Sequence, residues 1–120
     1  MSKFIPLPQA VEMTSLYRMQ KENILDPSQR NKKILAICET FDRVDFDTIL
    51  AQQGCVKVRI YYGMDETLKV HAVIVGANSK DEDILPGSQT TSLDADGDGI
   101  SEEGTRCPDI CPPGSPLNGG

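Results

Sequence analysis

The stretch LDADGDGISEEG, residues 93–104, carries the densest set of side chains in this sequence that could do chemistry. Its aspartates alternate with small residues, and Gly97 and Gly99 permit the positive φ angles that a loop needs to wrap around an ion. Carboxylate and main-chain carbonyl oxygens are the ligands that Ca²⁺ prefers. The spacing predicts a calcium site with five ligand residues: Asp94, Asp96, Asp98, Ile100 and Glu102. The alternative is a hydrated acidic turn, because Asp-Gly pairs are also ordinary turn formers.

Two calcium-binding patterns are similar to this stretch. In an EF-hand loop, ligands occupy positions 1, 3, 5, 7 and 9 with glycine at position 6, where Gly99 falls here. Position 12 holds Thr105 instead of the bidentate glutamate, so we expect weak binding, roughly 10⁻⁴–10⁻³ M. Residues 94–109 also resemble a thrombospondin type 3 repeat, in which D-x-D-x-D-G-I/V precedes further acids and Cys-Pro. That resemblance implies calcium in an extracellular setting.

The C-terminal cysteines Cys107 and Cys111 form the second candidate site. Three residues separate them, whereas zinc knuckles and thioredoxin motifs have two. A structural zinc ion needs four ligands, so Cys38 and Cys55 would have to join the pair. The alternatives are a zinc site, a redox pair, two thiols in a loop, or a small disulfide ring if the protein is exported. Because cysteine is often buried, we expect Cys38 and Cys55 to lie in the core.

Four basic side chains alternate along two segments that have the pattern of strands: Lys57, Arg59, Lys69 and His71. If the segments pair as a hairpin, this face could bind an anion, a nucleotide phosphate or an acidic protein. It could equally be solvated, or the acidic C-terminal segment could lie over it. The sequence has one histidine and no nucleophile-elbow, P-loop or zinc-protease motif. We therefore expect a non-catalytic protein, and the alternative is a small enzyme with a pocket near His71, using a Cys55–His71 pair.

Charge is divided unevenly along the 120 residues. Residues 1–80 hold eleven Lys and Arg against nine Asp and Glu, whereas residues 81–120 hold one arginine against nine acids, for a net charge of −6. An acidic segment repels phosphate, so nucleic acid is not an expected partner. No apolar run reaches the length of a signal peptide or a membrane span. We expect a cytoplasmic protein without a membrane partner, in which the cysteines are reduced.

Local patterns predict the elements that position these groups. Residues 9–25 place apolar side chains at spacings of three and four, which predicts a helix. Asp26-Pro27 ends that helix and begins a further helical turn. Residues 34–41 predict a buried strand. We expect Asp45 to cap a short helix, with Val44 and Ile49 in contact across its first turn.

The segments CVKVRIYYG and LKVHAVIVG alternate in polarity on either side of a short loop, which predicts an antiparallel hairpin. We expect eight residues to face the core and pack on the helices: Val56, Val58, Ile60, Tyr62, Leu68, Val70, Ala72 and Ile74. The predicted fold class is α+β, with an N-terminal helix, a strand, a short helix and a β-hairpin that form a small sheet. Residues 1–80 would form this domain, and residues 81–120 a loop-rich acidic tail containing Gly, Pro and Cys. A hairpin with an open edge predicts a monomer or a strand-paired dimer.

Three segments together resemble a group of small uncharacterised bacterial proteins: RIYYG at 59–63, VIVG at 73–76 and CPDICPPGSPLN at 107–118. The segment MTSLYR at 13–18 corresponds to an M-T-x-x-[YF]-R pattern in the N-terminal helix of that group. The resemblance covers most of the chain and implies no activity, cofactor or catalytic residue. We therefore expect a small interaction or accessory domain with an unidentified protein partner. This domain could also carry a weak calcium-binding loop. The alternative is a zinc-binding or thiol-redox protein.

Overall fold

The computed structural model describes residues 3–86, 100–101, 104–107 and 110–119. The fold class is α+β, as predicted, with two α-helices and six β-strands in this described part of the chain. The chain forms two compact units: unit 1 consists of Met1–Cys38 and Arg106–Gly120, and unit 2 of Glu39–Thr105. This division differs from the predicted one at residue 80, because two short strands after that residue join the hairpin in unit 2.

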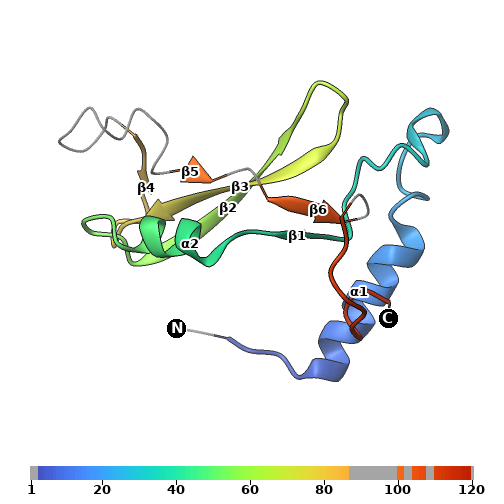
Figure 1. The fold of residues 1–120 in the computed structure, drawn as a ribbon, viewed down its shortest axis with the longest axis horizontal. Helices are drawn as coiled ribbons and strands as arrows, with labels where there is room; N and C mark the ends of the chain where they lie inside the picture. Colours follow the sequence, from blue (N-terminus) through green and yellow to red (C-terminus); the bar gives the residue numbers. More distant parts are fainter. Residues whose placement is uncertain (1–2, 87–99, 102–103, 108–109, 120) are drawn as a thin grey trace. The chain divides into compact units, whose positions relative to one another are not determined.

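Unit 1 contains the long helix α1, Leu7–Gln20 (Figure 1). Pro8 lies in its first turn, where a backbone N–H has no acceptor within the helix. The helix ends earlier than predicted, because Arg30 binds the carbonyl groups that follow it. Its Nε donates to Glu22 O at 2.9 Å and to Leu25 O at 3.2 Å. Among the described residues, no helix is both long and apolar enough to cross a membrane.

After α1 the chain forms the 3₁₀ turn η1, Pro27–Gln29, and later the strand β1, Cys38–Thr40. Asp26 caps η1 as predicted, because its Oδ2 accepts a hydrogen bond from Ser28 N at 3.0 Å. β1 is shorter than the predicted strand and pairs with β6, Thr105–Cys107, in a two-stranded sheet. The boundary between the two units falls within this strand pair.

Hydrogen bonds from side chains hold the extended segment before β1. The guanidinium of Arg106, which is 7% exposed, donates from Nη2 to Lys33 O at 3.1 Å and to Ile34 O at 3.0 Å. Tyr17 Oη donates to Ala36 O at 2.7 Å, and burial raises the pKa of this hydroxyl. Side chains therefore satisfy carbonyl groups that would otherwise require a strand partner.

Unit 2 is built on the hairpin of β2, Lys57–Met64, and β3, Val70–Ala77 (Figure 1). β3 lies inside a four-stranded antiparallel sheet. β2 pairs along one side of β3, and the two short strands β4, Asp83–Ile84, and β5, Ile100–Ser101, pair along the other. The predicted hairpin is confirmed.

Helix α2, Arg43–Leu50, crosses one end of the hairpin (Figure 1). Gly76 permits this approach, because a Cβ atom there would lie 2.8 Å from Cys55 Sγ and 3.3 Å from Ile49 Cγ2. The side chain of Ile49 is 1% exposed. The buried apolar residues of unit 2 are Ile49, Ile74, Val75, Ala77 and Ile84.

Two expectations about α2 are wrong. Asp42 is the N-cap residue, and Asp45 lies within the first turn. Asp45 instead contacts β5, since Ser101 Oγ donates to its Oδ2 at 3.3 Å. Val44 is the second residue of the helix and not the residue before its N-cap, so it does not hold the position expected to contact Ile49, and it is 62% exposed.

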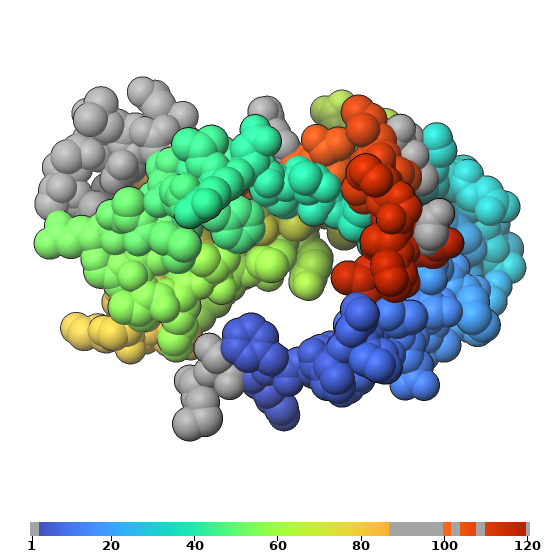
Figure 2. All heavy atoms as spheres, turned by 60° about the horizontal axis from the view of Figure 1, so that its bottom comes forward, coloured from blue at the N-terminus to red at the C-terminus, as the bar shows by residue number. Residues whose placement is uncertain are grey.

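The side-chain row predicted to face the core is buried on β3 near Gly76 and exposed on β2. Ile74 is buried, whereas Ile60, directly opposite it, is 49% exposed, and Tyr62 and Met64 on the same face are 79% and 60% exposed. α2 has eight residues, about two turns, and therefore covers only the end of the hairpin that contains Gly76. Figure 2 shows residues 43–64, coloured from teal to green, at the surface of the molecule.

Two substitutions on α2 test this account of the core. We expect Ile49→Ala to lower the free energy of unfolding by about 2–5 kcal/mol, because it removes buried methyl groups and leaves a cavity. Val44→Ala, at an exposed position of the same helix, should change it by less than about 0.5 kcal/mol. Urea unfolding followed by circular dichroism measures both, and equal losses would contradict the assignment.

Candidate functional site

The loop between β2 and β3 is organised around the carboxylate of Asp65. Its Oδ1 accepts hydrogen bonds from Thr67 N at 2.8 Å, Thr67 Oγ1 at 2.6 Å and Lys69 N at 3.1 Å. Its Oδ2 lies 2.6 Å from His71 Nε2. These bonds favour the ionised carboxylate, so Thr67 first and His71 next hold the pKa of Asp65 well below its usual range. Asp65 therefore fixes both the loop and the ring of His71.

Glu39, on β1, approaches the other nitrogen of the His71 ring. Its Oε2 lies 3.8 Å from His71 Nδ1, and its Oε1 accepts from Ala72 N at 2.9 Å. Oε2 is buried and has no hydrogen-bond partner among the residues that the structure describes. Gly104 makes this position possible, because a Cβ atom there would lie 2.5 Å from Glu39 Cγ.

His71 thus lies between two carboxylates that face opposite nitrogens of its ring. The carboxylate oxygens of Asp65 and Glu39 lie on opposite sides of the imidazole ring, so they cannot converge on one metal ion. The described residues contain no group of three or more side chains that could hold a metal. Cys55, the nucleophile suggested with His71, contacts Gly76, which lies five residues along β3, or roughly 16 Å away. The arrangement orders the hairpin loop and gives no support to catalysis by a Cys–His pair.

The predicted basic face consists of four residues: Lys57, Arg59, Lys69 and His71. Three of them are paired with acids in the structure, and His71 was described above. Lys57 Nζ lies 3.4 Å from Asp81 Oδ1, and the guanidinium of Arg59 binds both Asp81 and Asp83. These contacts, with Lys57 first and Arg59 next, lower the pKa of Asp81. The first acids of the segment predicted as a tail therefore lie over this part of the face.

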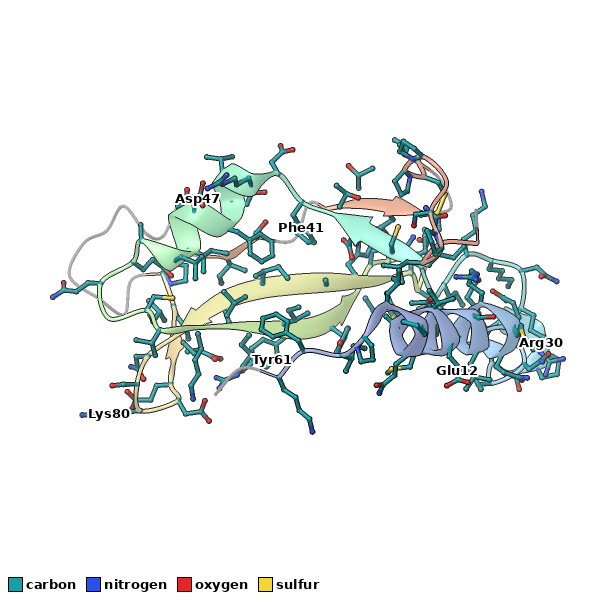
Figure 3. All side chains as sticks on the ribbon, turned by 90° about the horizontal axis from the view of Figure 1, so that it is seen from below. Glu12, Arg30, Phe41, Asp47, Tyr61 and Lys80 are labelled. Atoms are coloured by element: carbon teal, nitrogen blue, oxygen red, sulfur yellow. A yellow bond between two sulfur atoms is a disulfide. The ribbon has the colours of Figure 1, made fainter. Side chains whose placement is uncertain are left out.

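Tyr61, labelled beside β2 in Figure 3, also belongs to this charged cluster. Its Oη donates a hydrogen bond to Asp83, which raises the pKa of Tyr61 and, together with Arg59, lowers that of Asp83. An external anion would have to displace Asp81 and Asp83 from Arg59. The interpretation of this face as an anion site is therefore weaker than the sequence pattern indicated.

The cysteines fall into two groups. Cys107 and Cys111 form a disulfide with a Cα–Cα distance of 4.5 Å, so the ring alternative is the one found. Cys107 is buried and Cys111 is exposed. Cys38 and Cys55 are free and half-buried, so they lie at the margin of the core and not within it.

The predicted calcium loop falls largely outside the described residues. Asp94, Asp96, Asp98 and Glu102 are not among them, and Ile100 is the one predicted ligand that is. Ile100 lies in β5, opposite Val75 of β3. The calcium site stays a prediction.

The outer edge of β2 combines unpaired backbone groups with apolar side chains. Ala72 N donates to Glu39 and Asn78 N to Glu82 O, so the even-numbered residues of β3 direct their backbone groups away from β2. Directly opposite residues of an antiparallel pair either bond to each other or both point away. The outward N–H and C=O groups of β2 therefore belong to Val58, Ile60, Tyr62 and Met64. The described residues of unit 2 provide no partner for them.

The sequence predicted a hairpin with an open edge, and the structure shows that this edge belongs to β2. Alternation alone does not say which edge or face of a strand is covered. One signal was present in the adjacent pair Tyr61-Tyr62. Neighbouring side chains of a strand point to opposite faces, so the pair places one tyrosine on each face of β2. Both tyrosines are exposed, at 46% and 79%.

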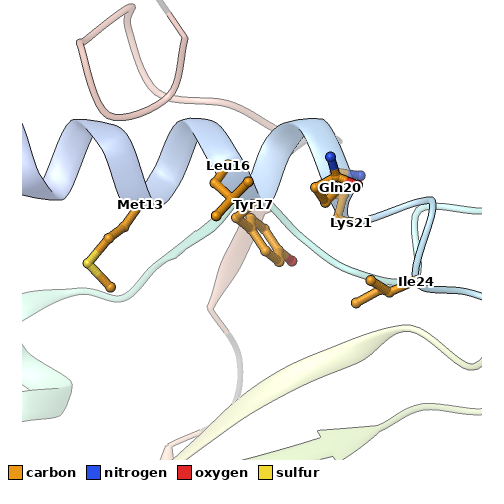
Figure 4. Close-up of a pocket in the computed structure, with 6 residues that line it drawn as sticks. All are labelled: Met13, Leu16, Tyr17, Gln20, Lys21 and Ile24. Atoms are coloured by element: carbon orange, nitrogen blue, oxygen red, sulfur yellow. The ribbon is translucent and has the colours of Figure 1, made fainter.

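In unit 1, α1 carries an apolar groove of about 260 Å³ (Figure 4). The residues that line it are Met13, Leu16, Tyr17, Gln20, Lys21 and Ile24. Met13 and Leu16 are more than half exposed. The apolar stripe predicted for this helix is therefore present, and it forms a surface of unit 1.

Comparison with protein-family models, with curated proteins and with solved structures gives no match to this chain. The site must therefore be interpreted from its own geometry.

The low pKa of Asp65 makes stability depend on pH. A carboxylate whose pKa is lower in the folded state stabilises the fold above its unfolded value, near 3.8, and this contribution is lost as pH falls. We expect the free energy of unfolding to drop below about pH 4, and Asp65→Asn to reduce that drop. Urea unfolding at pH 3 and pH 6 measures it. Asp47→Asn, at an exposed carboxylate of α2, is the control, and the same loss of pH dependence in both variants would contradict the role of Asp65.

Proposed function

We propose that this protein is a non-catalytic interaction domain whose binding surface is the outer edge and exposed face of β2. One observation carries the proposal: outward backbone groups and exposed apolar side chains coincide at Ile60, Tyr62 and Met64. Sheet edges with free backbone groups pair readily with another strand. Contiguous exposed apolar side chains are typical of protein interaction sites.

Both ends of β2 are held in place, which favours binding. Asp65 and His71 fix the end at the loop. Arg59, bound to Asp81 and Asp83, fixes the other end. A strand that is already ordered loses less conformational entropy on binding than a flexible segment.

Tyr62 is the side chain with the most to contribute. Full burial of a large apolar side chain stabilises a complex by about 1.5–3 kcal/mol, and aromatic residues often dominate binding energies. Tyr62 is 79% exposed, so most of its surface remains available to a partner.

We expect Tyr62→Lys to weaken partner binding at least about tenfold without unfolding the protein. The wild-type protein, Tyr62→Lys and Val44→Lys are immobilised separately and exposed to extract of the source cells. Val44→Lys is the matched control, because it also replaces an exposed apolar side chain in unit 2. A protein retained by the wild type and by Val44→Lys, and lost from Tyr62→Lys, supports the proposal. Equal retention on all three contradicts it.

The Cys107–Cys111 disulfide favours a second candidate function, in thiol–disulfide exchange. Cys111 is exposed and Cys107 is buried, so an external thiolate reaches Cys111 Sγ. Attack there forms a mixed disulfide and releases Cys107 as a thiolate. A second thiolate of the reductant then attacks the reductant's own sulfur in the mixed disulfide, which leaves both cysteines reduced and the reductant oxidised. While the two sulfurs are bonded, neither is a thiolate that could bind zinc, so the zinc alternative applies to the reduced form.

A redox role predicts that Cys107 and Cys111 convert reversibly between the disulfide and the two free thiols. In glutathione mixtures we expect the number of reactive thiols in the unfolded protein to change from two to four, with a midpoint above about −300 mV. Cys55→Ser, which leaves the disulfide intact, should give the same midpoint. A disulfide that glutathione does not reduce in the folded protein would indicate a structural role instead.

A further inference from the structure

We propose that the partner of the β2 edge is a second copy of this chain, joined to the first by antiparallel pairing of the two β2 strands. The inference rests on the proposed function, because it names the partner of that surface. Two copies of β2 can pair only where their outward-facing backbone groups meet, and these groups come from the even-numbered residues. An even-numbered residue must therefore lie opposite another even-numbered residue. This is so only if the two-fold axis passes through the position of one residue and not between two residues.

The charged side chains select the position of that axis. An axis at Arg59 would set Arg59 directly opposite its own copy. An axis at Tyr61 sets Lys57 of each copy opposite Asp65, the residue directly after β2, of the other. An axis at Ile60 gives Lys57 no acid opposite it. An axis at Tyr62 would set Arg59 opposite Asp65, but it pairs Val58 with a residue beyond the strand and so forms fewer hydrogen bonds. Opposite charges across a strand pair stabilise it and like charges destabilise it, so we place the axis at Tyr61.

The same axis pairs the exposed apolar side chains of the other face. Ile60 of one copy lies opposite Tyr62 of the second, and Val58 lies opposite Met64, each twice by symmetry. Roughly eight backbone hydrogen bonds would join the two strands. The outward groups that have no partner in unit 2 would thus be satisfied, and the apolar face would continue across both copies.

Self-pairing requires one surface to complement itself under a two-fold rotation. β2 meets this requirement because its charges differ at the two ends: Lys57 begins the strand, and Asp65 follows its last residue. A strand of uniform charge would repel its copy in every antiparallel register. This arrangement favours a second copy over an unrelated strand.

Sedimentation equilibrium of the full chain tests the inference. We expect the wild type to have twice the mass of one chain and Ile60→Pro the mass of one chain. Proline at this position removes an outward N–H and leaves intact the β2–β3 bonds, which use the odd-numbered residues of β2. Ile60→Ala keeps the N–H and should remain a dimer. Urea unfolding verifies that each variant is folded.

Cysteine crosslinking tests the axis independently, in a chain that also carries Cys38→Ser and Cys55→Ser. Tyr61→Cys would place two thiols directly opposite each other, with Cα atoms about 4.5–5.5 Å apart, within reach of a disulfide. The two thiols of Ile60→Cys would be offset by two residues along the strands, beyond that reach. We expect a crosslinked dimer from Tyr61→Cys and little from Ile60→Cys.

Three results would overturn the inference: a wild-type monomer at millimolar concentration, a dimer that persists in folded Ile60→Pro, or crosslinking through Ile60→Cys in preference to Tyr61→Cys. The proposed function fails separately. A monomer that still retains another protein through Tyr62 would exclude self-pairing and leave the interaction surface standing. A dimer with the expected response to Ile60→Pro and Tyr61→Cys supports both.

Discussion

The pairing of β2 with β3 is the interaction on which the structure of unit 2 depends. β4 and β5 attach to the free side of β3, and α2 packs against it at Gly76. Side chains alternate between the two faces of a strand. If the pairing shifted by one residue, every side chain of the shifted strand would therefore move to the opposite face of the sheet. The bonds of Asp65 at the loop and of Arg59 toward the open end oppose such a shift.

The short length of α2 explains why a well-formed sheet presents apolar side chains to its surroundings. Two helical turns are enough to bury Ile49 over the end of the hairpin that carries Gly76. Tyr62 and Met64 lie toward the loop, beyond that cover, and Ile60 is half exposed on the outer strand although it lies opposite buried Ile74. The same strand directs its unpaired backbone groups outward. The functional proposal follows from this uneven cover and not from a cluster of reactive side chains.

The charged groups of unit 2 serve mainly to hold the hairpin. Asp81 and Asp83 bind Lys57 and Arg59, so acids of the C-terminal segment offset a basic row that the sequence alone suggested as a ligand site. His71 lies between two carboxylates and is oriented by the nearer one, Asp65. Such partly exposed pairs contribute little energy individually, but together they restrict where the strand ends can lie.

Local features were determined by the sequence itself. The α+β class, the hairpin and the Asp26 cap of η1 depend on neighbouring residues, whose alternation and turn chemistry can be read directly. The tertiary structure decided the rest. Glu39 meets His71 only because Gly104 leaves room for it, and the exposure of Tyr62 depends on how far α2 reaches. Contacts between residues far apart in the chain leave no periodic pattern in it. The histidine cluster, and which strand of the hairpin has the open edge, could therefore not be deduced before the elements were placed together.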